Sequence, residues 1–195
     1  MSHYFENDKN LKSEEKMIKV KIKNQDFSFL VDHGVFSKKG LDFGTRTLLE
    51  SLEIEKLNGN ILDFGCGYGP IGIFLSKNTN AFIDMIDINE RSLNLAKKNA
   101  NLNQCNVHIF YSNLYENVEK KYDYIITNPP IRVGKEIVYK ILIEAKNNLK
   151  KNGELWFVIH KDQGAKSTLK MLEDYYQVNL MTKNKGFYII KAVNN

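Results

Sequence analysis

The stretch Asp63-Phe64-Gly65-Cys66-Gly67-Tyr68-Gly69 decides the fold expected for this chain. It leaves the apolar run Asn60 to Phe64 and ends just before Pro70, a residue suited to the first turn of a helix. Glycine at every second position lets the backbone approach a ligand closely. About twenty residues later, Asp87 ends the next apolar run, where a carboxylate can bind both hydroxyls of a ribose. This spacing predicts a nucleotide-binding turn between a strand and a helix.

Apolar runs and helical stripes alternate regularly from residue 60 onward. The expected strands are Asn60 to Phe64, Phe82 to Ile86, Val107 to Tyr111, Tyr122 to Thr127, Leu155 to Ile159, Val178 to Met181 and Phe187 to Ala192. Helices are expected over Gly44 to Leu52, from Pro70, over Glu90 to Leu102, and along the stripe Val138, Ile141, Leu142, Ala145 and Leu149. Strands that alternate with helices predict a parallel sheet covered on both faces. The last two strands, separated only by a tight turn, are expected to form a hairpin.

The N-terminal part shows a different pattern. Ile18 to Ile22 and Phe27 to Val31 alternate with period two around Lys23-Asn24-Gln25-Asp26, which predicts a β-hairpin. This hairpin either covers one end of the core or contacts a partner. A length of 195 residues fits one domain. We therefore expect a single domain over 1–195, with a hairpin and cap segment at 1–40 and a catalytic core at 41–195.

The second informative motif is Asn128-Pro129-Pro130-Ile131, directly after the apolar run Tyr124 to Thr127. Two prolines end the strand and leave backbone carbonyls outside any helix. An Asn side-chain oxygen and a neighbouring peptide carbonyl can hold a planar NH2 group by both of its hydrogens. This arrangement suits transfer of a group onto nitrogen.

Composition sets broader limits on function. The net charge of +5 and pI near 9.0 allow a polyanionic partner, although the lysines are scattered. Cys66 and Cys105 do not have metal-ligand spacing, so no metal is expected. No apolar run approaches a membrane-spanning length, and the first residues lack the pattern of a signal peptide. These features predict a cytoplasmic protein.

The motifs at 63–69, at Ile86-Asp87-Ile88-Asn89 and at 128–131 resemble, in order and spacing, those of class I S-adenosylmethionine-dependent methyltransferases with an Asn-Pro-Pro motif. Gly34 to Ser37, followed by Leu41 to Thr45, is similar to the segment before the catalytic core in small-domain (MTS) methyltransferases. The chain resembles single-domain relatives of the ribosomal small-subunit RNA guanine-N2 enzymes of that family. The resemblance implies a Rossmann-like fold with a mostly parallel seven-stranded sheet and an antiparallel C-terminal strand. It also implies S-adenosylmethionine as cofactor and ribosomal RNA or a ribosomal subunit as partner.

The resemblance further implies a set of cofactor-binding residues. In it, the three glycines form a floor under the cofactor, and Asp87 binds the ribose. Asn113 stands where the family has an acidic residue that contacts the adenine amino group, so weaker binding is expected. Asp63 has two interpretations: a carboxylate near the methionine ammonium, or a helix-capping residue. The full set is Asp63, Gly65, Cys66, Gly67, Gly69, Asp87, Ile88, Asn113, Leu114 and Asn128.

The catalytic residues implied are Asn128, Pro129, Pro130 and Ile131. The Asn128 side-chain oxygen and the Pro129 carbonyl would hold the target amine and stabilise its developing positive charge. Adenine-N6 and glutamine methyltransferases usually have Tyr or Phe where this chain has Ile131, which favours guanine N2 of small-subunit ribosomal RNA as the target. Methylation of a protein glutamine or of adenine N6, and a non-catalytic role in RNA assembly, stay open as alternatives.

Several further residues each have two interpretations. Phe36 and Asp42 either close the cofactor pocket or pack the N-terminal segment onto the core. Three cations, Arg132, Lys135 and Lys161, either meet RNA phosphates or are ordinary surface charges. His160 ends a strand on the same edge of the sheet and is interpreted as a neighbour of the reacting groups rather than a catalytic residue.

Overall fold

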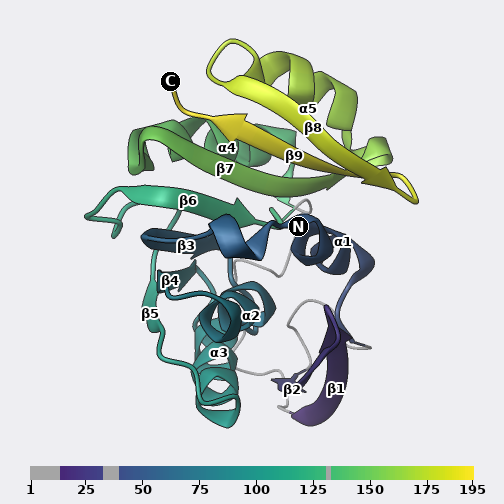
Figure 1. Cartoon of the computed structure of the whole chain (residues 1–195), viewed down its shortest axis with the longest axis vertical. Helices are drawn as coiled ribbons and strands as arrows, with labels where there is room; N and C mark the ends of the chain where they lie inside the picture. The colour runs from purple at the N-terminus through teal and green to yellow at the C-terminus, as the bar shows by residue number, and fades with distance from the viewer. Residues whose placement is uncertain (1–13, 33–39, 131–132) are drawn as a thin grey trace.

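The computed structural model describes residues 14–32, 40–130 and 133–195. The described residues form a two-stranded sheet and a seven-stranded sheet with the order β5-β4-β3-β6-β7-β9-β8 (Figure 1). Along this order, neighbouring strands from β5 through β4, β3 and β6 to β7 pair in parallel. Strand β9 is antiparallel to both of its neighbours, β7 and β8. The strands are β3 (Asn60–Phe64), β4 (Phe82–Asp87), β5 (His108–Tyr111), β6 (Tyr122–Thr127), β7 (Leu149–His160), β8 (Gln177–Asn184) and β9 (Phe187–Val193). The predicted mostly parallel seven-stranded sheet with an antiparallel C-terminal strand is confirmed.

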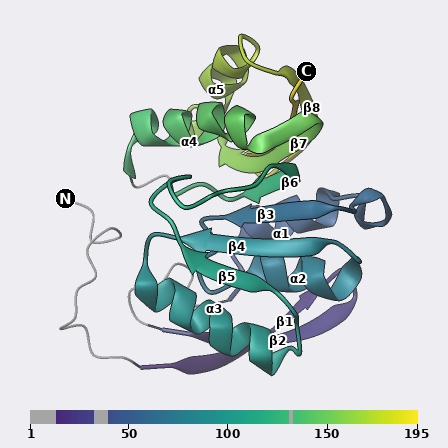
Figure 2. The ribbon, with the colours of Figure 1, turned by 90° about the vertical axis from the view of Figure 1, so that its left-hand side faces the viewer.

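Helices pack on both faces of the large sheet (Figure 2). They are α1 (Phe43–Ser51), α2 (Pro70–Asn78), α3 (Glu90–Leu102), α4 (Lys135–Asn148) and α5 (Ala165–Leu172). Buried residues of α1 to α3 share one hydrophobic cluster, and those of α4 and α5 share a second. Successive strand residues alternate between the two clusters: Ile61 belongs to the first and Leu62 to the second. The sheet is therefore buried on both faces, as the alternation of strands and helices predicts.

Two elements differ from the sequence expectation. Strand β7 begins at Leu149 rather than Leu155, because Leu149 already pairs with Tyr122 and the pairing register then shifts before Glu154. Leu149, which the helical stripe includes, is thus the first residue of a strand. Helix α5 was not expected, since its buried face holds only Ala165, Thr168 and Leu172, too few apolar positions for a helical period to stand out.

The predicted N-terminal hairpin is confirmed as β1 (Lys16–Ile22) and β2 (Gln25–Val31). Two Asn side chains of α3 bind the backbone of β2. The fully buried Asn99 accepts a hydrogen bond from the Leu30 N–H at 2.6 Å and donates to the Leu30 carbonyl at 2.9 Å. It also donates to the carbonyl of Tyr68 in the glycine-rich turn at 2.8 Å. The hairpin is thereby attached to that turn.

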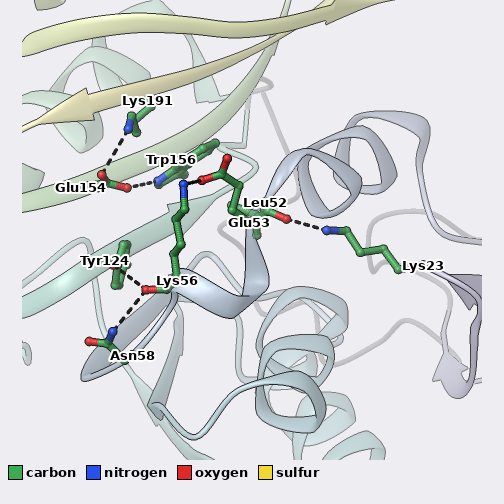
Figure 3. Close-up of polar contacts among 9 residues, drawn as sticks. All are labelled: Lys23, Leu52, Glu53, Lys56, Asn58, Tyr124, Glu154, Trp156 and Lys191. Carbon is green, nitrogen blue, oxygen red and sulfur yellow. Dashed lines mark hydrogen bonds and ion pairs between the residues drawn. The ribbon is translucent and has the colours of Figure 1, made fainter.

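Polar contacts also fix the link between α1 and β3 (Figure 3). In the short helical turn η1 (Ile54–Lys56), the Lys56 carbonyl accepts a hydrogen bond from the Tyr124 hydroxyl at 3.1 Å. Lys23, at the tip of the hairpin, donates to the Leu52 carbonyl at 2.5 Å. Nearby, Figure 3 shows Glu154 accepting from Trp156 and pairing with Lys191. Hairpin, helix α1 and sheet are therefore joined by hydrogen bonds as well as by apolar packing.

We expect Asn99→Ala to lower the free energy of unfolding by about 3 kcal/mol, because three backbone groups lose their partner and each costs roughly 1 kcal/mol. Urea denaturation measures the change. Asn103→Ala is the matched control, one helical turn away. Asn103 is less buried; on β2 it binds the Ser28 backbone, with the Ser28 N–H at 3.4 Å, and its other partner is the Asn99 carbonyl within the helical end itself. Its loss should be clearly smaller. Equal losses for the two variants would contradict a special role of Asn99.

In the part of the chain that the structure describes, no helix has both the length and the apolar character needed to span a bilayer.

Candidate functional site

The two motifs found in the sequence meet at the carboxyl ends of the parallel strands. Thr127, just before Asn128, pairs with Phe64, just before Gly65, and its hydroxyl donates to the Phe64 carbonyl at 2.8 Å. The Cys66 N–H donates to the carbonyl of Ile86 on the next strand at 2.9 Å. Ligands of open α/β sheets bind in a crevice at this edge. The tertiary structure thus brings together two motifs that are 63 residues apart in the sequence, measured from Phe64 to Thr127.

The glycine-rich turn leaves open space above its backbone. Gly65, Gly67 and Gly69 have φ angles of +68°, +57° and +98°, a region that favours glycine. A Cβ atom at Gly65 or Gly67 would meet no atom of the described residues within 4 Å, apart from its own chain neighbours. At Gly69 it would lie 3.0 Å from the Ile73 side chain. The first two glycines therefore border free space, whereas the third permits close packing of α2.

A cavity that opens to solvent lies beside this turn. Its lining includes six residues expected at the site: Gly65, Asp87, Ile88, Asn113, Leu114 and Pro130. It also includes five residues that were not predicted: Phe64, Ile86, Ser112, Ile137 and Ile141. The four apolar residues among them were missed because apolar residues in a strand or helical stripe give the same sequence signal whether they face a cavity or the core. Their apolar side chains suit a flat aromatic ligand.

Asp87 lines this cavity while its own carboxylate is bound by the backbone. It is 3% exposed, and its oxygens accept hydrogen bonds from the N–H groups of Gly67 at 2.9 Å and Asn89 at 2.8 Å. Burial raises the pKa of Asp87, and these hydrogen bonds oppose that rise. Asp87 therefore holds the glycine-rich turn in place and presents acceptor lone pairs at the cavity wall.

Asp63 is fully buried beneath the same turn. One oxygen accepts a hydrogen bond from the Gly72 N–H at 2.8 Å, in the first turn of α2, which is the capping role. The other oxygen has no hydrogen-bond partner among the residues that the structure describes. Burial raises the pKa of Asp63 to about 7. A buried acceptor without a partner is costly, so this atom fits a ligand that brings a cationic donor.

Asn113 faces the cavity with its amide held in one orientation. Its NH2 group donates to the Glu116 carboxylate at 2.9 Å. A carboxylate only accepts hydrogen bonds, so the side-chain oxygen of Asn113 points away from Glu116. The Asn113 oxygen is therefore a neutral acceptor at the position where the family has an acidic residue.

Asn128 is half-buried at the end of β6. Its NH2 group donates to the Thr45 hydroxyl at 2.9 Å and to the Asp42 carboxylate at 3.2 Å. Among residues 14–32, 40–130 and 133–195, no group donates a hydrogen bond to the Asn128 side-chain oxygen or to the Pro129 carbonyl. The Pro130 carbonyl accepts from the Val133 N–H at 3.3 Å. Two acceptors at this motif thus have no donor within the described part of the chain.

Three residues singled out in the sequence, Phe36, Ile131 and Arg132, lie outside the described residues. Cys66 is buried in the hydrophobic core and is not among the residues that line the cavity. Lys135 lies with its ammonium 5.0 Å from the centre of the Tyr139 ring. Lys161 is exposed in the turn η3 (Lys161–Gln163). In the described ranges, no group of three or more His, Cys, Asp or Glu residues could hold a metal ion.

Aromatic residues surround the start of α1, beside Asp42. A Cβ atom at Gly44 would lie 3.0 Å from the Phe187 ring and 3.2 Å from the Asp42 carboxylate. The Phe187 ring is also 4.8 Å from the His160 ring, which it meets edge to face. His160 Nδ1 accepts a hydrogen bond from the Asp162 N–H at 3.3 Å. His160 thus packs against the aromatic ring that lies beside Gly44.

Comparison with known proteins identifies the family of this chain. The family model described as "Methyltransferase small domain" matches residues 26–191. An uncharacterized protein of Bacillus subtilis, YbxB, is 45% identical and covers 97% of both chains. The ribosomal RNA small subunit methyltransferase C of Haemophilus influenzae is 36% identical over 163 residues, which are 81% of this chain and 49% of that protein. The chain thus spans about half the length of the curated methyltransferases C that it matches.

Among solved structures, the T. thermophilus 16S rRNA N2 methyltransferase RsmC, in complex with AdoMet and guanosine, superposes with a TM-score of 0.85. The two sequences are 22% identical, and the match covers 95% of this chain and 52% of that one. This similarity shows the fold. The family match covers most of the chain. Gly65 and Asp87 line a cavity at the carboxyl ends of the parallel strands, the part of open α/β sheets where ligands bind in general. The chain belongs to the methyltransferase small domain family of class I S-adenosylmethionine-dependent methyltransferases.

Proposed function

We propose that this protein methylates an exocyclic amino nitrogen, and that the target is guanine N2 of small-subunit ribosomal RNA. The observation that carries the proposal is the orientation of Asn128. Its NH2 group is bound by Thr45 and Asp42, and its oxygen and the Pro129 carbonyl are left to accept hydrogen bonds. Two neighbouring acceptors match the two hydrogens of an amino group.

The residues at the cavity fit S-adenosylmethionine. When bound, this cofactor supplies an electrophilic methyl group on its sulfonium. Asp87 would accept hydrogen bonds from the ribose hydroxyls, and the Asn113 oxygen would accept one from the adenine amino group. The unpartnered oxygen of Asp63 would bind the ammonium of the methionine part, and Gly65 and Gly67 leave room for its chain.

Asn128 and Pro129 would make the target amine nucleophilic. The lone pair of an exocyclic amine is delocalised into its ring, so the nitrogen must be turned and polarised before it can attack. Hydrogen bonds from both N–H groups to the Asn128 oxygen and the Pro129 carbonyl would do this and would stabilise the positive charge that develops. Holding the amine in line with the methyl group can supply roughly 7–11 kcal/mol of the barrier. A dedicated base is not required, because the methylated ammonium is acidic enough to lose its proton to water.

Guanine is favoured over the other amines by the relatives. Ribosomal RNA small subunit methyltransferases C share 33% to 36% identity with this chain, and the T. thermophilus structure contains guanosine. The net charge of +5 suits an RNA partner. A ribosomal substrate also implies a cytoplasmic location.

The hairpin shares a hydrophobic cluster with α1 to α3, which supports our proposal that 1–195 act as one domain.

The test is transfer of labelled methyl groups from S-adenosylmethionine to small ribosomal subunits isolated from cells that lack the gene. Nucleoside analysis should find the label in N2-methylguanosine. Small subunits from cells that keep the gene are already methylated and should accept little labelled methyl. Label in a protein glutamine or in N6-methyladenosine would replace guanine with that target, and cofactor binding without any transfer would favour the non-catalytic role.

We also expect cofactor binding to depend on the protonation of Asp63. Its pKa of about 7 means that the free protein holds a neutral carboxyl below that pH, whereas pairing with an ammonium requires the charged form. Binding should therefore release a proton, and the Kd should rise up to about tenfold for each pH unit below 7. Titration calorimetry from pH 5.5 to 7.5 measures this. Asp63→Asn should bind more weakly at pH 7.5 and lose the dependence; an unchanged slope in this variant would exclude Asp63 as its source.

A further inference from the structure

The start of helix α1 binds the side-chain amide of Asn128 across a long stretch of sequence. Asp42 is the N-cap of α1, and its Oδ1 accepts the Thr45 N–H at 2.9 Å. The same Oδ1 accepts a hydrogen bond from Asn128 Nδ2 at 3.2 Å, and the Thr45 hydroxyl accepts another at 2.9 Å. The two acceptors for the amide are thus built into one turn of one helix.

This arrangement determines which way the amide faces. A carboxylate only accepts hydrogen bonds, so turning the amide over would bring the Asn128 oxygen against the Asp42 oxygen, two acceptors without a proton between them. Asp42 cannot rotate away without losing its hydrogen bond to the Thr45 N–H.

We propose that Asp42 and Thr45 are positioning residues, which hold the Asn128 oxygen toward the target amine. The negative charge of Asp42 also polarises the Asn128 amide along the hydrogen bond, and this makes the amide oxygen a stronger acceptor. The transition state needs this effect more than the ground state does, because positive charge develops on the amine. The inference rests on the proposed function, in which Asn128 contacts the substrate.

The experiment compares Thr45→Val with Thr47→Val. Both threonines are buried in α1, at 3% and 4% exposure, but the Thr47 hydroxyl donates only within the helix, to the Phe43 carbonyl. With labelled S-adenosylmethionine and undermethylated small subunits, Thr45→Val should lower kcat on the order of tenfold to 10²-fold, as a misplaced reacting group does. KM for the subunits and Kd for the cofactor should stay within about twofold, and Thr47→Val should keep its kcat. Thr45→Ser, which restores the hydroxyl, should recover most of the rate.

Asp42→Asn tests the charge separately, because Asn is also a good N-cap. It should lower kcat while urea denaturation shows little loss of stability. Wild-type kcat in both Thr45→Val and Asp42→Asn would overturn the inference, as would equal losses in Thr45→Val, Thr45→Ser and Thr47→Val. Asn128→Ala separates the two proposals. If that variant is inactive while Thr45→Val and Asp42→Asn are normal, only the inference fails, whereas a fully active Asn128→Ala removes the proposed function as well.

Discussion

Asn128→Ala is expected to lower kcat for methyl transfer by about 10²- to 10³-fold, with the Kd for S-adenosylmethionine unchanged within about threefold. The substitution removes the acceptor that we propose binds the target amine, and loss of one preorganised hydrogen-bonding group of this kind costs that much in other enzymes. It takes nothing from the cavity lining, since Asn128 is not part of it. Single-turnover transfer of labelled methyl and calorimetry measure the two quantities.

Asn58→Ala serves as the control for this variant. Asn58 is another Asn just outside a strand, but it precedes β3 and so lies at the amino ends of the parallel strands, whereas Asn128 lies at their carboxyl ends. The hydrogen bond of its amide goes to the Lys56 carbonyl. It should keep the wild-type kcat. If Asn128→Ala and Asn58→Ala were equally active, the target amine would have to be bound elsewhere, and the mechanism proposed here would be wrong.

Asp87→Ala is expected to raise the Kd for S-adenosylmethionine by at least about 10²-fold. Hydrogen bonds to a charged group contribute roughly 1.5–3 kcal/mol each, and the ribose would lose two of them. The variant also leaves the Gly67 and Asn89 N–H groups without their acceptor, so the glycine-rich turn loses its support. Calorimetry with the folded variant gives the Kd, and urea denaturation gives its stability.

Asp84→Ala is the matched control on the same strand. Asp84 is 4% exposed and, like Asp87, a hydrogen-bonded buried carboxylate, but its partners are the Tyr122 hydroxyl at 2.6 Å and Lys120 at 2.9 Å. It lies away from the cavity. This variant should lose stability and keep its Kd. A wild-type Kd in Asp87→Ala would mean that the ribose is bound by other groups.

Much of the fold follows from local sequence patterns. Apolar runs bounded by turn residues are enough to place β3, β4 and β6, and α3 was expected over the same residues that it occupies, Glu90–Leu102. The places of the turn glycines and of Asp87 in the fold could also be predicted, since strand, turn and helix follow each other within a few residues. Where the local signal is short or ambiguous, as in α5 and at the start of β7, the sequence expectation was incomplete or wrong.

The sequence by itself determined the order of strands and helices, the glycine-rich turn and the presence of an Asn with two prolines after a strand. These depend on residues close together in the chain, whose spacing reflects the geometry of one element. Only the tertiary structure decided that Asp42 binds Asn128, 86 residues away, that Asn99 joins the hairpin to the turn, and that Asp63 caps α2 with one oxygen and leaves the other unpaired. Such contacts depend on how distant elements pack, and a hydrogen bond between two side chains leaves no periodic trace in the sequence.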